Sequence, residues 1–390
     1  MLRYRDNAKW LMWLAPMRTH AISAAYLSPF FLSNGLNQAQ IFSIQSIFSI
    51  AYLLWEVPSG YIADRFGRAR CIKLSAPLAA ISMIGYGLSS HYWQFIVGEI
   101  GLAIASGLVS GGDTALLYDS LKADGREDEF VRLSQRIKAV GFVGTTIGVP
   151  IAILLVTTFG IGSTLMADGA LLLLGCPIIW KLVEAPHQGE SAEKDSIKAW
   201  GASCKLLANT QARWIIALGV SLSTATYLAA WLSTPYYLSL GVPLWAFSIF
   251  MAVRNLFKAL LAHRFHGEQH LLLTYVGYAL TAGLVYAAMA SGQVWLIWVI
   301  LGHDAIQALH EPPLTRRLNH HISAEVRATL NSVANLMQRL VFAVCGPLVG
   351  LLVDQAGLST GFVAIGTVTG TFSLVAVARL NQLKTFSNPE

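Results

Sequence analysis

Residues 60–70 read GYIADRFGRAR and connect two long apolar stretches of the chain. One acid and three arginines lie within seven residues of this segment. Charged side chains are costly in hydrocarbon, so we expect the segment to lie at a face of a membrane. Gly60 and Gly67 are predicted to permit a tight backbone and a close approach of helices that larger residues would block. The segment therefore predicts a short hinge between two membrane-spanning helices.

The composition indicates a membrane protein. Of the 390 residues, 55% are hydrophobic and only 12% are charged, whereas soluble domains carry about 25% charged residues. The net charge of +6 is typical of basic loops on the cytoplasmic side of a membrane, and this reading is preferred over nucleic-acid binding. The four cysteines have no metal-binding spacing and imply no disulfide.

Twelve apolar runs are long enough to cross a bilayer as helices, which takes about 20 residues. A large soluble α-protein with so many runs would have almost no polar surface. We therefore predict an all-α membrane protein with twelve transmembrane helices. The runs lie near residues 10–32, 40–62, 71–89, 93–119, 129–157, 161–183, 213–238, 243–264, 270–290, 294–316, 327–353 and 358–380.

The polar segment 184–212 separates six runs from six, so we predict bundles at 1–183 and 213–390. Within the segment, Ile197, Trp200, Cys204 and Leu207 recur at helical spacing. An amphipathic helix at the membrane interface is the expected structure, and a loop with scattered apolar residues is the alternative.

The distribution of basic residues predicts the orientation. Alternate linkers contain no Lys or Arg, whereas the opposite set is rich in both, and positive charge marks the cytoplasmic side. Both termini and the 184–212 segment are thus expected in the cytoplasm, and residues 1–9 show no cleavage site of a removed signal peptide. The linkers without basic residues are 33–39, 90–92, 158–160, 239–242, 291–293 and 354–357.

Short sequence motifs that recur about 200 residues apart indicate that a six-helix unit is used twice. The tetrapeptide ADRF at 63–66 is echoed by AHRF at 262–265, and QRI at 135–137 by QRL at 338–340. A glycine pair, Gly144 and Gly148, is echoed by Gly346 and Gly350. Such pairs permit close helix packing, which we expect for the fifth and eleventh helices.

Residues 60–70 resemble the signature loop of the major facilitator superfamily, G-x-x-x-D-R-x-G-R-[RK]. Ala69 departs from it, and the basic residue follows at Arg70. The preceding EVPSG at 56–60 looks like the drug-exporter-like branch of that family. The resemblance implies a twelve-helix secondary transporter of the bacterial inner membrane, with two six-helix bundles related by an axis along the membrane normal. The matching positions are Gly60, Asp64, Arg65, Gly67 and Arg68.

For this branch the resemblance implies proton antiport and export. One departure concerns the fifth helix, where members often carry G-P-x-x-G-G and this chain has Gly148-Val-Pro150. The resemblance also implies that Asp119 pairs with Arg68 and that Asp64 caps the inner end of helix eleven. With Gly60, Arg65 and Gly67 these residues would form a latch that favours the state closed to the cytoplasm. A solvated surface ion pair is the alternative.

Ionisable residues inside apolar runs are functional candidates by default. Arg18 either binds an anionic group or is permanently paired with an acid such as Asp113. Asp113 is the preferred proton-coupling carboxylate and Glu99 the second choice. Asp168, on the sixth helix, is expected to have a structural pairing or dimer role, because that helix is peripheral in the family.

Arg254 and Lys258 are four residues apart and share one helix face. Two like charges there need an anion, supplied by Asp304 or by a substrate, although Lys258 can also extend toward the cytoplasm. His303 beside Asp304 suits a proton relay or a packing role. The remaining candidates for the substrate-binding site are Arg339, Tyr227 and Trp231.

We find no P-loop, HExxH or nucleophile motif, so we expect no enzyme activity, no metal and no cofactor. The predicted function is proton-coupled export of a small anionic or zwitterionic metabolite, such as a carboxylate siderophore or an organic acid, by alternating access. The predicted partners are this substrate, protons and membrane lipid, without nucleic acid, and the chain is expected to be monomeric. Alternatives are multidrug efflux of lipophilic compounds, proton-coupled uptake, and a lipid-handling or receptor protein on the same scaffold.

Overall fold

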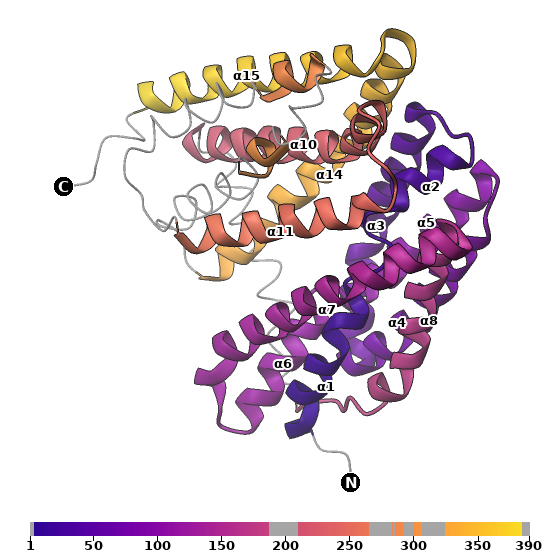
Figure 1. Ribbon diagram of the computed structural model, residues 1–390. Coiled ribbons are helices and arrows are strands. Elements are labelled where there is room, and N and C mark those ends of the chain that lie inside the picture. The colour runs from indigo at the N-terminus through magenta and orange to yellow at the C-terminus, as the bar shows by residue number, and fades with distance from the viewer. Residues whose placement is uncertain are drawn as a thin grey trace. The chain divides into compact units, whose positions relative to one another are not determined.

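The computed structural model describes residues 4–186, 210–264, 283, 285–291, 300–305 and 324–383. All regular elements in these ranges are helices (Figure 1). Seven of them are long and apolar enough to cross a membrane, or eight if a bent helix pair is counted as one span. The predicted all-α membrane class is confirmed.

The chain forms two compact units, and each is described by itself. The first contains residues 1–36, 47–189 and 243–252, and the second contains residues 37–46, 190–242 and 253–390. Two helices, α3 (Gln38–Phe66) and α11 (Ala246–Arg264), contribute residues to both units. The predicted boundaries at 183 and 213 stay a prediction.

Helices α4, α5 and α8 build the centre of the first unit, where α4 packs against both of the others. A cluster of buried aromatic rings joins α2, α4 and α5, with Phe31 and Phe95 at a centroid distance of 5.3 Å and Tyr86 and Phe95 at 5.7 Å. The elements of the unit are η1 (Tyr4–Asp6), α1 (Asn7–Leu14), η2 (Ala15–Arg18), α2 (Leu27–Ser33), α4 (Arg68–Leu88), α5 (Tyr92–Val109), α6 (Gly112–Ala123), η3 (Glu127–Glu129), α7 (Phe130–Phe159) and α8 (Gly162–Ile179), with parts of α3 and α11.

The second unit is built on α10 (Thr210–Ser239), which packs against α14 (Ala324–Ala356) and α15 (Leu358–Gln382). The first turns of α3 join it through Asp354, whose carboxylate accepts hydrogen bonds from the backbone N–H groups of Gln38 and Ala39, both at 2.9 Å. A Cβ on Gly350 would lie 2.6 Å from the Cα of Ala39. The prediction of close packing at this glycine is confirmed.

Two predicted spans are broken, and the prediction of continuous helices there was wrong. In the run 10–32, α1 ends at Leu14, and residues 19–26 form turns between η2 and α2. In the run 93–119, Gly111 has φ of 68° between α5 and α6. Pro16 lacks a backbone donor and glycine adopts positive φ without a Cβ clash, so both breaks have a local cause.

Proline also bends α3, which turns by 45° between Glu56 and Pro58. A proline inside a helix removes one backbone hydrogen bond and clashes with the preceding turn. The predicted second span is thus present over residues 38–66, with a bend just before the signature loop.

The glycine pair of α7 packs against the broken first span. A Cβ on Gly144 would lie 2.5 Å from the Cβ of Pro16, and one on Gly148 would lie 2.4 Å from the backbone oxygen of Ala21. Close approach at this pair was predicted and is confirmed. The glycines provide room for the interrupted backbone to approach α7 closely.

Some predicted elements lie outside the described residues. The amphipathic helix expected within 195–207 is one of them. The runs 270–290 and 294–316 are described only at residues 283, 285–291 and 300–305.

Candidate functional site

In the first unit, an ion pair connects the two broken spans. Arg18 is the last residue of η2, and Asp113 lies in the first turn of α6. Arg18 Nη1 lies 3.1 Å from Asp113 Oδ2, and the side chains are 28% and 35% exposed. Asp113 Oδ1 also accepts a hydrogen bond from the backbone N–H of Thr114 at 2.7 Å, and a helix N-terminus favours a negative charge. Of the two roles open to Arg18, pairing with Asp113 is the one seen in this structure.

Two cavities flank this ion pair, with volumes of about 300 Å³ and 360 Å³. Arg18 and Asp113 line both of them, and hydroxyl groups supply much of the other polar lining. Volumes of this size suit water or a small molecule. The further polar lining residues are His20, Ser75, Ser106 and Ser110 in the first cavity, and Thr19, Thr114, Ser134 and Lys138 in the second.

Glu99 has a different environment from Asp113. It is 4% exposed on α5 and accepts a hydrogen bond from the hydroxyl of Tyr86, which is itself fully buried. Neither of the two cavities is lined by Glu99. Its carboxylate therefore has a protein partner within the aromatic cluster.

In the second unit, Arg254 of α11 makes a bidentate ion pair with Asp304. Arg254 Nε lies 2.7 Å from Asp304 Oδ2, and Nη2 lies 3.0 Å from Oδ1. Lys258 Nζ lies 4.0 Å from the same Oδ1. The Asp304 side chain is 0% exposed, whereas Arg254 and Lys258 are 15% and 30% exposed. Asp304 is thus the anion that the two cations were expected to need.

Among the residues that the structure describes, this cluster has two cations and one carboxylate. A planar guanidinium binds a carboxylate through two parallel hydrogen bonds, and burying such a pair is costly unless its geometry is good. Arg254 also donates from Nη1 to Ser233 Oγ at 3.5 Å. A further anionic group would therefore bind here in competition with the present partners of the two cations.

The other candidates of the second unit lie on several helices. His303 is buried, and its Nδ1 lies 3.5 Å from the hydroxyl of Tyr286. The ring of Tyr227 packs edge-on against Phe342 at a centroid distance of 4.6 Å. Trp231 on α10 and Arg339 on α14 are half-buried. The contacts of Tyr227 and His303 indicate packing roles, and their part in binding stays a prediction.

The signature loop makes its predicted ion pair. Arg68 pairs with Asp119 of α6 through Nη1, and its Nη2 lies 3.7 Å from Asp64 Oδ1. Arg65 donates a hydrogen bond to the hydroxyl of Tyr61 at 2.9 Å. The pairing of Arg68 with Asp119 is confirmed, and the cap of Asp64 on helix eleven stays a prediction.

Glu184 also contacts this loop, and the sequence analysis did not find it. Its carboxylate accepts hydrogen bonds from the backbone N–H groups of Arg68 at 2.7 Å and Ala69 at 3.0 Å, and so caps α4. Gly67 has φ of 104°, and a Cβ there would lie 2.6 Å from Glu184 Oε2. A Cβ on Gly60 would meet no described atom within 4 Å. The requirement for glycine is confirmed at Gly67 and not supported at Gly60.

Asp168 of α8 also makes contacts that the sequence analysis did not predict. Its side chain is fully buried, and its two oxygens accept hydrogen bonds from the backbone N–H groups of Ile22 at 3.2 Å and Ser23 at 2.8 Å. The expected structural pairing is therefore with backbone of the broken first span. In the sequence, the only sign of this pairing is that Asp168 is an acid inside an apolar run.

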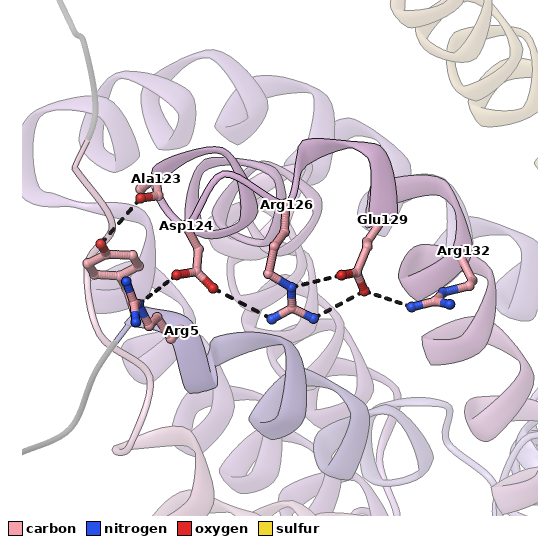
Figure 2. Close-up of polar contacts among 7 residues, drawn as sticks. Arg5, Ala123, Asp124, Arg126, Glu129 and Arg132 are labelled. Carbon is pink, nitrogen blue, oxygen red and sulfur yellow. Dashed lines mark hydrogen bonds and ion pairs between the residues drawn. The ribbon is translucent and has the colours of Figure 1, made fainter.

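A chain of exposed ion pairs joins the end of α6 to the start of α7 (Figure 2). Asp124 lies 2.6 Å from Arg5 and 3.6 Å from Arg126, and Glu129 lies 2.9 Å from Arg126 and 2.7 Å from Arg132. The hydrogen bonds to Glu129 raise the pKa of Arg126. Water and salt screen ion pairs of this kind, so we expect them to contribute little to stability. None of these residues lines either of the two cavities, and we assign this surface network no part in binding.

Three solved structures that are similar over nearly the whole chain are transporters. The nucleoside transporter NupG superposes with a TM-score of 0.73 at 16% identity, covering 98% of this chain and 100% of that one. The D-xylose-proton symporter gives 0.71 at 15% identity, covering 96% of both chains. A bacterial homologue of the lysosomal transporter Spinster, inward-facing and occupied, gives 0.71 at 15%, covering 97% of this chain and 96% of that one. At these identities the likeness establishes the fold.

Sequence comparison agrees with the structural likeness. The inner membrane transport protein YajR of Escherichia coli (strain K12) is 27% identical over 122 residues, which cover 31% of this chain and 24% of that protein. The alignment thus spans about a quarter of this relative. The family model of the Major Facilitator Superfamily matches residues 12–346. The chain is a membrane transporter with this fold, and it belongs to the major facilitator superfamily.

Proposed function

We propose that this transporter moves a small anionic or zwitterionic metabolite in a proton-coupled cycle of alternating access. The observation that carries the proposal is the cluster of Arg254, Lys258 and buried Asp304. A carboxylate or phosphate group on the substrate would compete with Asp304 for these two cations. Nucleosides and sugars, which occur in the names of the structural neighbours, carry no such group unless phosphorylated.

Asp304 and a substrate anion would compete for Arg254, and this competition would couple substrate binding to proton binding. When ionised, Asp304 occupies two donors of Arg254, and a substrate anion must displace it. Protonation of Asp304 removes the competing charge, so the affinity for the anion rises as pH falls. Proton and anion then bind together, which is the thermodynamic condition for symport. This geometry supports proton-coupled uptake.

Export by antiport is the second candidate, and the pair of Arg18 and Asp113 favours it. An ammonium group of a zwitterionic substrate competes with a proton for the carboxylate of Asp113. Substrate and proton then exclude each other at this acid, and the affinity falls as pH falls. The resemblance of residues 56–60 to the drug-exporter-like branch implies the same direction.

The proposed setting follows from the charge pattern. We place the protein in the bacterial inner membrane as a monomer with both termini in the cytoplasm, because the basic residues gather in alternate loops. Its proposed partners are the substrate, protons and surrounding lipid.

A ligand panel tests the substrate class. Purified protein is heated with organic acids, carboxylate siderophores, amino acids, nucleosides and lipophilic cations, and compounds that stabilise it are tested for flux in proteoliposomes with an imposed proton gradient. Arg254→Gln should abolish stabilisation by carboxylates. Arg132→Gln, an exposed arginine outside the cluster, is the matched control and should bind normally. Stabilisation by lipophilic cations alone would contradict the anionic preference.

The pH dependence of the binding constant separates the two directions. Affinity that rises toward acid pH supports symport through Asp304, and Asp304→Asn should then bind the anion with little pH dependence. Affinity that falls toward acid pH supports antiport, and Asp113→Asn should then remove the dependence. A binding constant independent of pH, together with flux that ignores the proton gradient, would contradict proton coupling.

A further inference from the structure

The inference concerns Asp168 and the interrupted backbone of the first span. In a continuous helix, the N–H of Ile22 would bond to the carbonyl of Arg18 and that of Ser23 to the carbonyl of Thr19. Here both N–H groups donate to the carboxylate of Asp168, one to each oxygen. Buried backbone donors need a partner, and in lipid this requirement is strict. One side chain therefore satisfies two donors that the break has left over.

The broken segment also contains a strained residue. His20 has φ of 48°, a left-handed conformation that is uncommon for a residue other than glycine. Its Nδ1 is buried and has no hydrogen-bond partner within the described residues. Its imidazole also interacts electrostatically with Asp168 and Arg18. The bonds to Asp168 thus stabilise a conformation that the backbone does not otherwise favour.

Within the described part of the chain, the elements packed against α8 bring few charged groups near Asp168. Beside it, α4 presents Ala80 and Ile84 to Gly169, and residues 140–159 of α7 contain no charged residue. The broken span contributes Arg18 and His20. On α1, Lys9 lies over the ring of Trp10, which also contacts Lys181 beyond the end of α8.

We propose that Asp168 is a proton-binding site that clamps the first membrane-spanning segment in its broken form. As an ionised carboxylate, Asp168 accepts from both backbone N–H groups. Adding a proton to one oxygen turns that oxygen into an O–H donor facing an N–H donor, so one of the two bonds is lost. The segment can then relax toward a regular helix, with the N–H groups returned to the carbonyls of Arg18 and Thr19.

This clamp would couple a proton to the candidate site of the first unit. The backbone held by Asp168 lies four and five residues after Arg18. Arg18 pairs with Asp113 beside both cavities. Release of the segment would shift Arg18 and weaken that pair. The inference does not depend on which molecule is transported or in which direction.

Hydrogen exchange of the purified full-length protein tests the clamp without a substrate. Exchange of a peptide covering residues 19–26 is followed from pH 5 to pH 8.5 and corrected for intrinsic rates. We expect the wild type to lose protection of this peptide by about tenfold at the acid end, the size of effect that a lost buried hydrogen bond produces. Asp168→Asn, whose amide keeps one acceptor oxygen, should show the reduced protection of the acid end at every pH.

Two further variants complete the test. Asp354→Asn removes a carboxylate that also accepts two backbone N–H groups, but elsewhere, and should leave residues 19–26 as in the wild type. His20→Asn keeps a residue that tolerates positive φ but removes the titrating ring, and should shift the pH at which protection is lost. Wild-type protection that stays constant over the whole range would overturn the proposal, even if Asp168→Asn did not fold. Asp168→Asn with the full neutral-pH protection of the wild type would overturn it as well.

Discussion

Arg18 Nη1 and Asp113 Oδ2 lie 3.1 Å apart, and each residue lies at an interruption of a membrane-spanning segment. Breaks in transmembrane helices are tolerated only where the backbone is buried in protein or lines a cavity. Both conditions are met here, because the ion pair lines two cavities and Asp168 accepts the freed N–H groups. The interruptions therefore belong to a site and are not local defects of folding.

The first prediction concerns the coupling between these two residues. Arg18→Gln and Asp113→Asn each leave one charge without its partner, so each should destabilise the protein. The pair is about one-third exposed, so we expect a loss of roughly 1–2 kcal/mol in each variant, between the values for surface and buried pairs. The double variant should lose less than the sum of the two. Thermal unfolding in detergent measures all three, and strict additivity would show that the pair contributes no interaction energy.

The second prediction compares two glycines of the signature loop. Gly67→Ala adds a Cβ 2.6 Å from Glu184 Oε2 at a residue with φ of 104°, so it should cost about 1–3 kcal/mol. Gly60→Ala adds a Cβ into open space among the described residues and should be neutral or slightly stabilising, because alanine favours the helix. Unfolding temperatures of the two variants give the comparison. Equal stabilities would show that neither the backbone at Gly67 nor Glu184 constrains the loop.

The sequence predicted the fold well because the features that indicate it extend over many residues. Runs of about 20 apolar residues and the loop at 60–70 identify the family without any knowledge of contacts. Pro16 predicts a weakened helix near Arg18, because proline lacks a backbone donor, but the extent of the break there and the break at Gly111 were missed. The hydropathy of a segment does not change when its backbone leaves the helical path. Only the partners of the backbone N–H groups reveal a break.

Ion pairs were predictable when the sequence offered few partners. Arg68 with Asp119 followed from the family pattern, and Asp304 was named as the partner of Arg254 because few acids lie inside apolar runs. Asp168 and Glu184 bind backbone groups, and any segment can supply those. A sequence therefore shows that such an acid needs a partner, but it does not show which backbone provides it.

The third prediction concerns the latch. Asp64→Asn weakens a contact of 3.7 Å at a side chain that is 54% exposed, so abundance and unfolding temperature should stay near normal. If Asp64 also caps helix eleven in another state of the cycle, turnover in proteoliposomes should fall severalfold. Asp128→Asn, which removes an exposed acid of η3, is the control and should transport normally. Normal turnover in Asp64→Asn would remove the case for a latch.

The last prediction concerns the close packing of α7 against the broken span. Gly148→Ala would place a Cβ 2.4 Å from the backbone oxygen of Ala21, and a backbone atom cannot move aside as a flexible side chain can. The variant should therefore lose about 1–3 kcal/mol of stability through overpacking. Gly85→Ala in α4, whose Cβ meets no described atom within 4 Å, is the matched control and should keep full stability.

The same variant should disturb the site as well as the stability. Pushing Ala21 away from α7 displaces the backbone next to Ile22 and Ser23, so the bonds to Asp168 should weaken. Hydrogen exchange of residues 19–26 should then be faster in Gly148→Ala at neutral pH, while Gly85→Ala exchanges like the wild type. If Gly148→Ala lost stability but kept normal exchange in this peptide, the glycine would serve helix packing alone, and the broken backbone would owe its shape to Asp168 and not to α7.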